Sequence, residues 1–204
     1  MGTDGGKPER RSAMSERVRT PTILVVFGAT GDLMARKIVP SIFHLYRKAL
    51  LPERFRVVGF SRREWSDDDL RSHVRGIIAD KYPDADPQSV ETFLALFVYQ
   101  RGTFDDEGAY EALRDGNAGV DAEWGICANK LFYLAVPPEN YEIIFRSLAS
   151  SGLTEECSDK QGWTRVLVEK PFGNDIESSK ALDELLASLF REEQIYRIDH
   201  YLAK

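Results

Sequence analysis

The sequence predicts an α/β fold in which a doubly wound parallel sheet carries helices on both faces. Short apolar runs of the kind found in strands buried on both sides recur along the chain. Between them lie longer segments whose apolar residues recur at helical spacing, which is the alternation expected of βαβ units. The first apolar run leads directly into glycines and then into a helical pattern, as at the start of a Rossmann-like sheet.

The composition limits the classes of protein to which the chain can belong. Its 204 residues are 43% hydrophobic and 29% charged, which suits one globular domain with a short tail. The net charge of -6 argues against a nucleic-acid partner, and no apolar run is long enough to predict a membrane partner. Cys127 and Cys157 are too few for a disulfide framework and have no metal-ligand spacing, so we interpret both as reduced packing residues.

Residues 1–21 are polar, with glycine, proline and charges of both signs, and this composition predicts a disordered N-terminal tail. The tail lacks the apolar stretch of a secretory signal, and its acidic residues Asp4 and Glu9 argue against a transit peptide. We therefore expect a cytoplasmic protein whose folded domain occupies residues 22–204.

The first strand, expected at 23–27, is followed by the sequence Gly-Ala-Thr-Gly at 28–31. Glycines let the backbone turn tightly and approach a bound phosphate, and the helix that follows offers unpaired N–H groups and a positive dipole end. Taken alone, the G-x-x-G spacing is a weak signal, because a plain tight turn uses the same glycines. Arg36 and Lys37 follow in the helix, either as a solvated basic face or with one of them reaching back to a phosphate.

The remaining elements are expected from the same periodicities. We expect further strands at 55–60, 97–101, 130–136, 164–168 and 194–198. We expect helices at 31–49, 66–80, 87–97, 105–114, 140–149 and 175–190, with a loop at 115–126. Pro40 predicts a kink or a split in the first helix, and Ser66 is the expected N-cap of the second.

The end of the second strand indicates which coenzyme is used. In such folds this position meets the adenosine ribose, where a carboxylate binds the 2′-hydroxyl of NAD and an arginine accommodates the 2′-phosphate of NADP. Here Arg62 and Arg63 follow the strand, and the first carboxylate is Glu64. This pattern favours NADP over NAD, the alternative being a pair of surface arginines.

Later strand ends carry further candidate residues, because ligands of open α/β sheets lie at the carboxyl ends of the strands. Tyr141 follows the strand that ends in two prolines, and either packs on the coenzyme or fills the core. Lys170 follows the next strand, where it either pairs with Glu169 or points into the site. The last strand leads to Asp199, which His200 follows directly.

Four segments together resemble the coenzyme domain of the glucose-6-phosphate dehydrogenase family: GATGDL, FYLAVPP, VEKPFG and YRIDHYLAK, in that order. The resemblance runs from Thr22 to Lys204. It implies oxidation of D-glucose 6-phosphate to 6-phospho-D-glucono-1,5-lactone, the NADP-linked step of the pentose phosphate pathway.

The resemblance also implies where the coenzyme binds. Its phosphates would lie along Gly28, Ala29, Thr30, Gly31, Asp32, Leu33, Met34 and Ala35. Thr30 and Arg62 would lie near the 2′-phosphate, and Tyr141 would touch the coenzyme.

The same resemblance assigns the substrate side to the end of the chain. Lys170 would contact both the coenzyme and the sugar, as a catalytic as well as a binding residue. His200, Tyr201 and Lys204 would bind the substrate phosphate, and Asp199 would orient a catalytic histidine.

The chain departs from the family pattern in two ways. Ala203 stands where the family has glycine, which shifts the phosphate loop if the backbone there needs a positive φ. The family's general base is a histidine further along, on a second domain that also forms the dimer or tetramer, and His44, His73 and His200 do not match it. We therefore expect a fragment with negligible turnover, taken from a homo-oligomeric enzyme.

Two other functions remain open at this stage. A catalytically silent NADP-binding module would fit the short chain, although Lys170, Asp199 and His200 together argue against it. Another sugar oxidoreductase would share the Glu-Lys-Pro motif but does not need the cluster that follows the last strand.

Overall fold

The structure, a computed structural model, describes residues 20–157, 162–169 and 176–198. Six strands form one sheet in the order β3-β2-β1-β4-β5-β6, and every neighbouring pair is parallel. The strands are β1 Thr22–Phe27, β2 Phe55–Ser61, β3 Phe97–Arg101, β4 Asn129–Leu134, β5 Thr164–Glu169 and β6 Ile195–Ile198. The predicted α/β class and the doubly wound parallel sheet are confirmed.

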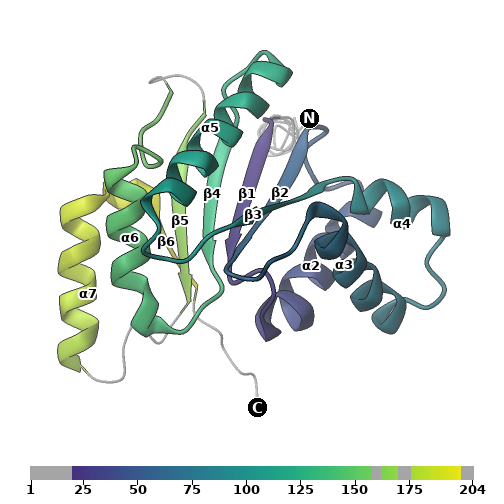
Figure 1. Ribbon diagram of the computed structural model, residues 1–204, viewed down its shortest axis with the longest axis horizontal. Helices are drawn as coiled ribbons and strands as arrows, with labels where there is room; N and C mark the ends of the chain where they lie inside the picture. Colours follow the sequence, from purple (N-terminus) through teal and green to yellow (C-terminus); the bar gives the residue numbers. More distant parts are fainter. Residues whose placement is uncertain (1–19, 158–161, 170–175, 199–204) are drawn as a thin grey trace, which may run out of the picture.

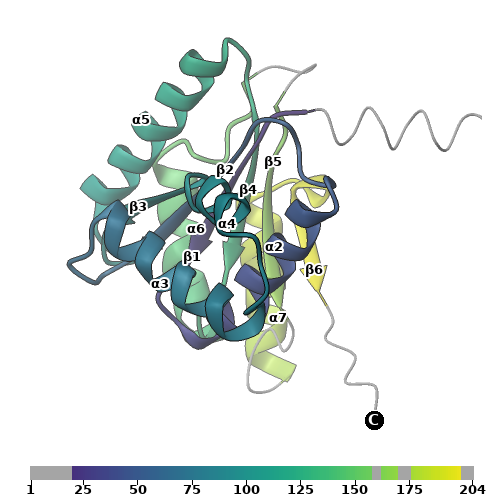
Figure 2. The same ribbon diagram turned by 90° about the vertical axis from the view of Figure 1, so that its right-hand side faces the viewer.

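Helices cover both faces of the sheet, as Figures 1 and 2 show. On one face lie α5 Glu107–Trp124, α6 Tyr141–Ser150 and α7 Ile176–Leu189. On the other lie the π-helix η1 Met34–Ile38, α2 Val39–Arg47, α3 Asp67–Lys81 and α4 Pro87–Leu94. Short 3₁₀ turns η2 Pro138–Asn140 and η3 Glu192–Gln194 precede α6 and β6. Within the described ranges, no helix is both long and apolar enough to cross a bilayer.

Strand β1 separates the two hydrophobic cores. Ile23, Val25 and Phe27 face the core under α5, α6 and α7, and none of the three is exposed. Leu24 and Val26 face the other core, at most 7% exposed. Successive side chains of a strand point to opposite faces, so burial on both faces requires the continuous apolar run seen in the sequence.

Two predicted helices near the first crossovers behave as their sequences require. The expected helix at 31–49 is divided into η1 and α2, and Pro40, the second residue of α2, lies directly after the junction of the two. Ser66 caps α3: its hydroxyl accepts from the Asp69 N–H at 3.2 Å, and the Asp69 carboxylate accepts from the Ser66 N–H at 2.8 Å. The helix expected at 87–97 ends earlier, at Leu94.

The predicted loop at 115–126 is wrong, because α5 continues through it to Trp124. Leu113, Asn117 and Val120 keep the helical spacing on the buried side. Gly116 and Gly119 fall on the open side, where an added methyl group would meet nothing within 4 Å. Glycine-rich composition was therefore a poor guide to the end of this helix.

The prediction that Cys127 and Cys157 are reduced packing residues is also wrong, since they form a disulfide with a Cα–Cα distance of 6.3 Å. Cys127 lies just before β4 and Cys157 lies in the loop before β5. These strands are parallel neighbours, with Lys130 beside Thr164, so both cysteines reach the amino-terminal edge of the sheet. Their separation of 30 positions in the sequence gives no sign of this proximity.

Replacing Gly116 or Gly119 with alanine should raise the free energy of unfolding by about 0.5–1 kcal/mol each, because glycine is a poor residue in a helix interior. Urea denaturation followed by circular dichroism measures the change. Gly102→Ala is the matched control and should destabilise, because its Cβ would lie 2.3 Å from that of Ala109. Destabilisation by both α5 substitutions would contradict a continuous helix.

Candidate coenzyme site

The chain makes a tight turn at the carboxyl end of β1. Gly28 has φ of 84°, its N–H donates to Phe60 O at 2.9 Å, and its carbonyl accepts from the Gly31 N–H at 2.9 Å. A Cβ at Gly28 would lie 2.6 Å from Ala135 O and 2.8 Å from a methyl carbon of Val136. Only glycine fits both this dihedral angle and this approach to the end of β4.

A cavity of about 610 Å³ opens above this turn. Its lining comes from the segments that follow β1, β2, β3 and β4: Gly28, Thr30, Gly31, Ser61, Arg62, Gly102, Thr103, Phe104, Asp105, Ala135, Val136, Pro137, Asn140 and Ile143. In this strand order the crossover direction reverses between β1 and β4, and ligands of open α/β sheets bind at such a switch point. The cavity therefore has the position of a nucleotide site.

The β2 side of the cavity is held by hydrogen bonds. The Thr30 and Ser61 hydroxyls lie 2.9 Å apart. The Tyr99 hydroxyl, which has one proton to donate, lies within hydrogen-bond distance of Ser61 O at 2.9 Å and of Arg63 O at 2.8 Å, on both sides of Arg62. Burial raises the pKa of Tyr99, which keeps this hydroxyl a donor.

Arg62 differs from the other basic residues at this edge. The Arg63 guanidinium lies over the Trp65 ring, 5.3 Å from its centroid, and Arg101 pairs with Glu64 at 2.6 Å. Arg62 is exposed, lines the cavity and makes no ion pair with any residue that the structure describes. A guanidinium in this position is available to an anionic ligand.

The wall formed by the end of β4 and the start of α6 is mostly apolar. Ala135, Val136 and Pro137 form its base, and Ile143 is 38% exposed on its surface. Asn140 adds one polar group. The cavity therefore pairs an apolar wall on the β4 side with a polar, cationic edge on the β2 side, which suits a ligand that has both rings and phosphates.

The sequence-predicted coenzyme residues divide into two groups. Gly28, Thr30, Gly31 and Arg62 line the cavity. The others do not: Ala29 and Met34 are fully buried, Leu33 and Ala35 are half-buried, and Asp32 is exposed and pairs with Arg36 at 2.7 Å. These residues belong to the turn and to the start of the helix, but their side chains do not line the cavity.

Tyr141 lies in the core and not in the cavity. It is 2% exposed, its ring centroid is 5.9 Å from that of Phe145, and burial raises its pKa. Of the two interpretations of Tyr141, the structure matches the one in which its side chain fills the core.

Several cavity residues were not singled out from the sequence, among them Ser61, Gly102, Thr103, Asp105, Asn140 and Ile143. Ser61 ends β2, and Gly102, Thr103 and Asp105 follow β3 closely, so the strand-end rule would have found these four. Asn140 and Ile143 lie further from β4, in η2 and α6, where that rule does not reach. A hydrogen bond from the Thr103 side chain holds the pKa of Asp105 below its usual range. This carboxylate stays ionised at neutral pH, so an anionic ligand is better placed near Thr30 and Arg62 than near β3.

The residues predicted for the substrate side, Lys170, Asp199, His200, Tyr201 and Lys204, lie outside the described residues. The strands that lead to them are described: β5 and β6 are parallel neighbours, and their last residues, Glu169 and Ile198, are paired. The Tyr133 hydroxyl donates to the Glu169 carboxylate, which ties the end of β5 to β4. Burial and this carboxylate raise the pKa of Tyr133.

A glycine turn and a cavity at the switch point of a 3-2-1-4-5-6 sheet define a dinucleotide-binding domain. Residues 25–204 match the family described as the NAD binding domain of glucose-6-phosphate dehydrogenase, and the chain belongs to this family. Its ligand class is therefore a nicotinamide dinucleotide.

Curated relatives and solved structures agree with this assignment. The chain is 38% identical over 197 residues to glucose-6-phosphate 1-dehydrogenase 2 of Mycobacterium tuberculosis, covering 96% of this chain and 38% of the relative. It is 39% identical over 194 residues to glucose-6-phosphate 1-dehydrogenase of Bacillus subtilis, covering 94% and 37%. A solved glucose-6-phosphate dehydrogenase in complex with glucose 6-phosphate superposes with a TM-score of 0.80 at 34% identity, covering 92% of this chain and 38% of that one.

The chain thus spans less than two fifths of the length of these relatives. The family assignment applies to the coenzyme domain that the chain contains.

Gly28→Ala should lower the free energy of unfolding by about 1–3 kcal/mol, because alanine is strained at positive φ and its methyl group collides with β4. It should also abolish coenzyme binding. Gly76→Ala in α3, where nothing lies within 4 Å, is the control and should be neutral or stabilising. Calorimetric titration with NADP measures binding, and unchanged affinity in Gly28→Ala would contradict a site at this turn.

Proposed function

We propose that residues 22–204 form the coenzyme domain of a glucose-6-phosphate 1-dehydrogenase, which oxidises D-glucose 6-phosphate to 6-phospho-D-glucono-1,5-lactone and transfers the hydride to NADP. The observation that carries this proposal is the cavity at the glycine turn, in a chain that matches the family along 25–204. A relative solved with glucose 6-phosphate supports the choice of substrate.

NADP, and not NAD, is the coenzyme that the β2 edge favours. A carboxylate there would bind a ribose 2′-hydroxyl, but the first carboxylate after β2, Glu64, already pairs with Arg101. Arg62 lines the cavity beside Thr30 and offers the planar pair of donors that suits a phosphate. The 2′-phosphate would therefore be held by Arg62 with help from the Thr30 hydroxyl.

The turn itself would hold the pyrophosphate. Gly28 and Gly31 leave the backbone bare, and the helix start after them supplies N–H groups and a positive dipole end. Ile143 and Pro137 would give the coenzyme rings an apolar surface. The bound nicotinamide accepts the hydride, and the protein contributes position and exclusion of water.

The substrate side would be built at the ends of β5 and β6. Lys170 would contact both coenzyme and sugar, and His200, Tyr201 and Lys204 would hold the substrate phosphate. Asp199 would orient the histidine that takes the C1 hydroxyl proton. The pairing of Glu169 with Ile198 supports this arrangement, because Lys170 and Asp199 follow directly from neighbouring strand ends.

We extend the proposal to the protein's localisation and partners. We propose a cytoplasmic enzyme that forms a homo-oligomer through sequence beyond this domain and has no nucleic-acid or membrane partner. A 37% identical relative from Arabidopsis thaliana is named as a cytoplasmic glucose-6-phosphate 1-dehydrogenase, and the net charge of -6 supports the absence of a polyanion partner.

Arg62→Ala should weaken NADP binding by about 10- to 100-fold and leave NAD binding nearly unchanged, since a charge-assisted contact to phosphate contributes about 1.5–3 kcal/mol. Arg63→Ala is the matched control, because its guanidinium stacks on Trp65 and does not line the cavity. Calorimetric titration with both coenzymes measures the ratio. Equal losses for NADP and NAD, or a larger effect of Arg63→Ala, would refute the role given to Arg62.

The 204-residue chain by itself should bind NADP but show negligible turnover with glucose 6-phosphate, because no described histidine can act as the base. His44 lies on α2, outside the cavity lining, and His73 on α3 packs against Trp65. Burial and the charge of Arg63 lower the pKa of His73. NADPH absorbance measures turnover, with the Bacillus subtilis relative as positive control; NADP reduction above background would contradict this expectation.

A further inference from the structure

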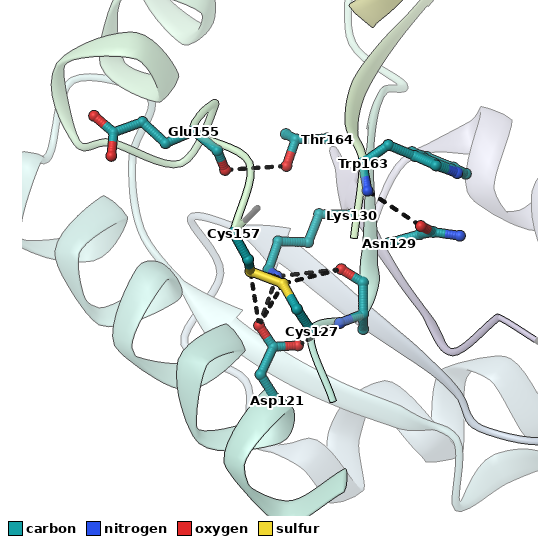
Figure 3. Close-up of a disulfide and its surroundings, with 9 residues drawn as sticks. Asp121, Cys127, Asn129, Lys130, Glu155, Cys157, Trp163 and Thr164 are labelled. Atoms are coloured by element: carbon teal, nitrogen blue, oxygen red, sulfur yellow. Dashed lines mark hydrogen bonds and ion pairs between the residues drawn. A yellow bond between two sulfur atoms is a disulfide. The ribbon is translucent and has the colours of Figure 1, made fainter. Parts of the chain in front are cut away.

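The disulfide lies far from the coenzyme cavity, at the opposite edge of the sheet. Cys127 precedes β4 and Cys157 lies in the loop that precedes β5, whereas the cavity lies beyond the carboxyl ends of the strands. Figure 3 shows the surroundings of the bond, with Lys130 and Asp121 both directed at the two sulfurs. Nothing in the proposed reaction uses this cluster.

Two oppositely charged side chains contact both sulfurs. The Lys130 ammonium lies 3.7 Å from Cys127 Sγ and 3.6 Å from Cys157 Sγ. The Asp121 carboxylate lies 3.8 Å from each sulfur, and the two charged groups are 2.6 Å apart. Their side chains are only 10% and 17% exposed, so water screens these contacts little.

This environment suits the reduced state as well as the oxidised one. A thiol can donate to the Asp121 carboxylate, and a thiolate can accept from the Lys130 ammonium, so neither sulfur would lack a partner after reduction. Lys130 also donates to Ala128 O at 3.3 Å, which holds the ammonium in place. A disulfide with a purely structural role needs no such groups.

We propose that Cys127 and Cys157 form a redox modification site, at which a dithiol opens the disulfide and Lys130 stabilises the departing thiolate. This rests on the proposed cytoplasmic enzyme, because disulfides in that compartment are usually transient or redox-sensing. Cys157 is the exposed cysteine of the pair and Cys127 is half-buried, so attack falls on Cys157.

The exchange balances in two steps. A thiolate of the dithiol attacks Cys157 Sγ, the bond between the two cysteines breaks, and Cys127 leaves as a thiolate beside Lys130. The second thiol of the reagent, as its thiolate, then displaces Cys157. The reagent ends as a cyclic disulfide, and the protein gains the two electrons and two protons that the reagent loses.

The loop that carries Cys157 connects the disulfide to the β5–β6 edge of the sheet through hydrogen bonds and an ion pair. The Gln194 side-chain amide donates to Thr154 O at 3.0 Å, and Arg191 pairs with Glu156 at 2.6 Å. The Thr164 hydroxyl donates to Glu155 O at 3.3 Å. Opening the disulfide frees one end of this loop, and β5 and β6 are the strands that lead to Lys170 and Asp199.

Equilibration of the 204-residue chain in mixtures of reduced and oxidised glutathione, followed by alkylation and mass measurement, tests reversibility. Both thiols should appear together as the mixture becomes reducing, and should disappear when it is reversed. Thiols that remain free in oxidised glutathione, or a bond that opens only in denaturant, would overturn the proposal.

Two substitutions with opposite expected signs test the role of Lys130. Lys130→Met should slow reduction by about three- to tenfold, because the leaving thiolate loses its cation. Asp121→Asn should accelerate it by a similar factor, and Lys130→Arg should restore a rate close to that of the wild type. Acceleration by both Lys130→Met and Asp121→Asn would mean that the substitutions only loosen the fold, and would refute the assignment.

Hydrogen exchange read by mass spectrometry tests the structural consequence. Reduction should increase exchange at residues 153–157, 164–169 and 192–198, and leave β1, β2 and β3 unchanged. Cys157→Ser should show the reduced pattern under all conditions. Uniform change across the sheet, or none at the β5–β6 edge, would overturn the coupling. None of these readouts uses coenzyme or turnover, so their failure is distinguishable from failure of the proposed function.

Discussion

The contact on which the structure depends is the passage of the Gly28 backbone against the end of β4. A methyl group at Gly28 would lie 2.6 Å from the Ala135 carbonyl oxygen. This closeness lets β1 stop, turn and start a helix within a few residues, level with the end of β4, whose last residue Leu134 is paired with Phe27. The open space above the turn exists because the chain leaves the sheet here, between β2 and β4, at the point where the crossovers change direction.

The parallel sheet places the cavity at its carboxyl edge and the disulfide at its amino edge. All six strands point the same way, so every residue that follows a strand reaches the carboxyl edge, where the cavity lies. The segments after β1 and β2 give this cavity its turn and its cation, and β5 and β6 end side by side in the direction of the proposed substrate residues. The amino edge carries the disulfide and its charged pair instead.

Much of the fold and part of the site could be predicted from the sequence, where a local rule determines the structure. Strand β1 was predictable because burial on both faces demands an uninterrupted apolar run, and α3 because Ser66 and Asp69 form a cap within one turn. The extent of α5 was not, since the helical spacing of its buried side decides it and Gly116 and Gly119 obscure that spacing. The disulfide was not, because strand pairing brings Cys127 and Cys157 together across 30 residues. At the site, strand ends indicated Arg62 and the glycines, whereas the inward orientation of Tyr141 depends on packing that no local pattern encodes.

Titration of the isotope-labelled chain with NADP, followed by amide chemical shifts, tests most directly whether the coenzyme binds at the turn after β1. The account predicts that the largest shifts fall on residues 28–31, on Ser61 and Arg62, and on the segment 135–143, with little change near Cys127 and Lys130. The structure has a second groove beside α2, lined in part by Arg36, Lys37 and Leu45. Largest shifts at these three residues would contradict the account.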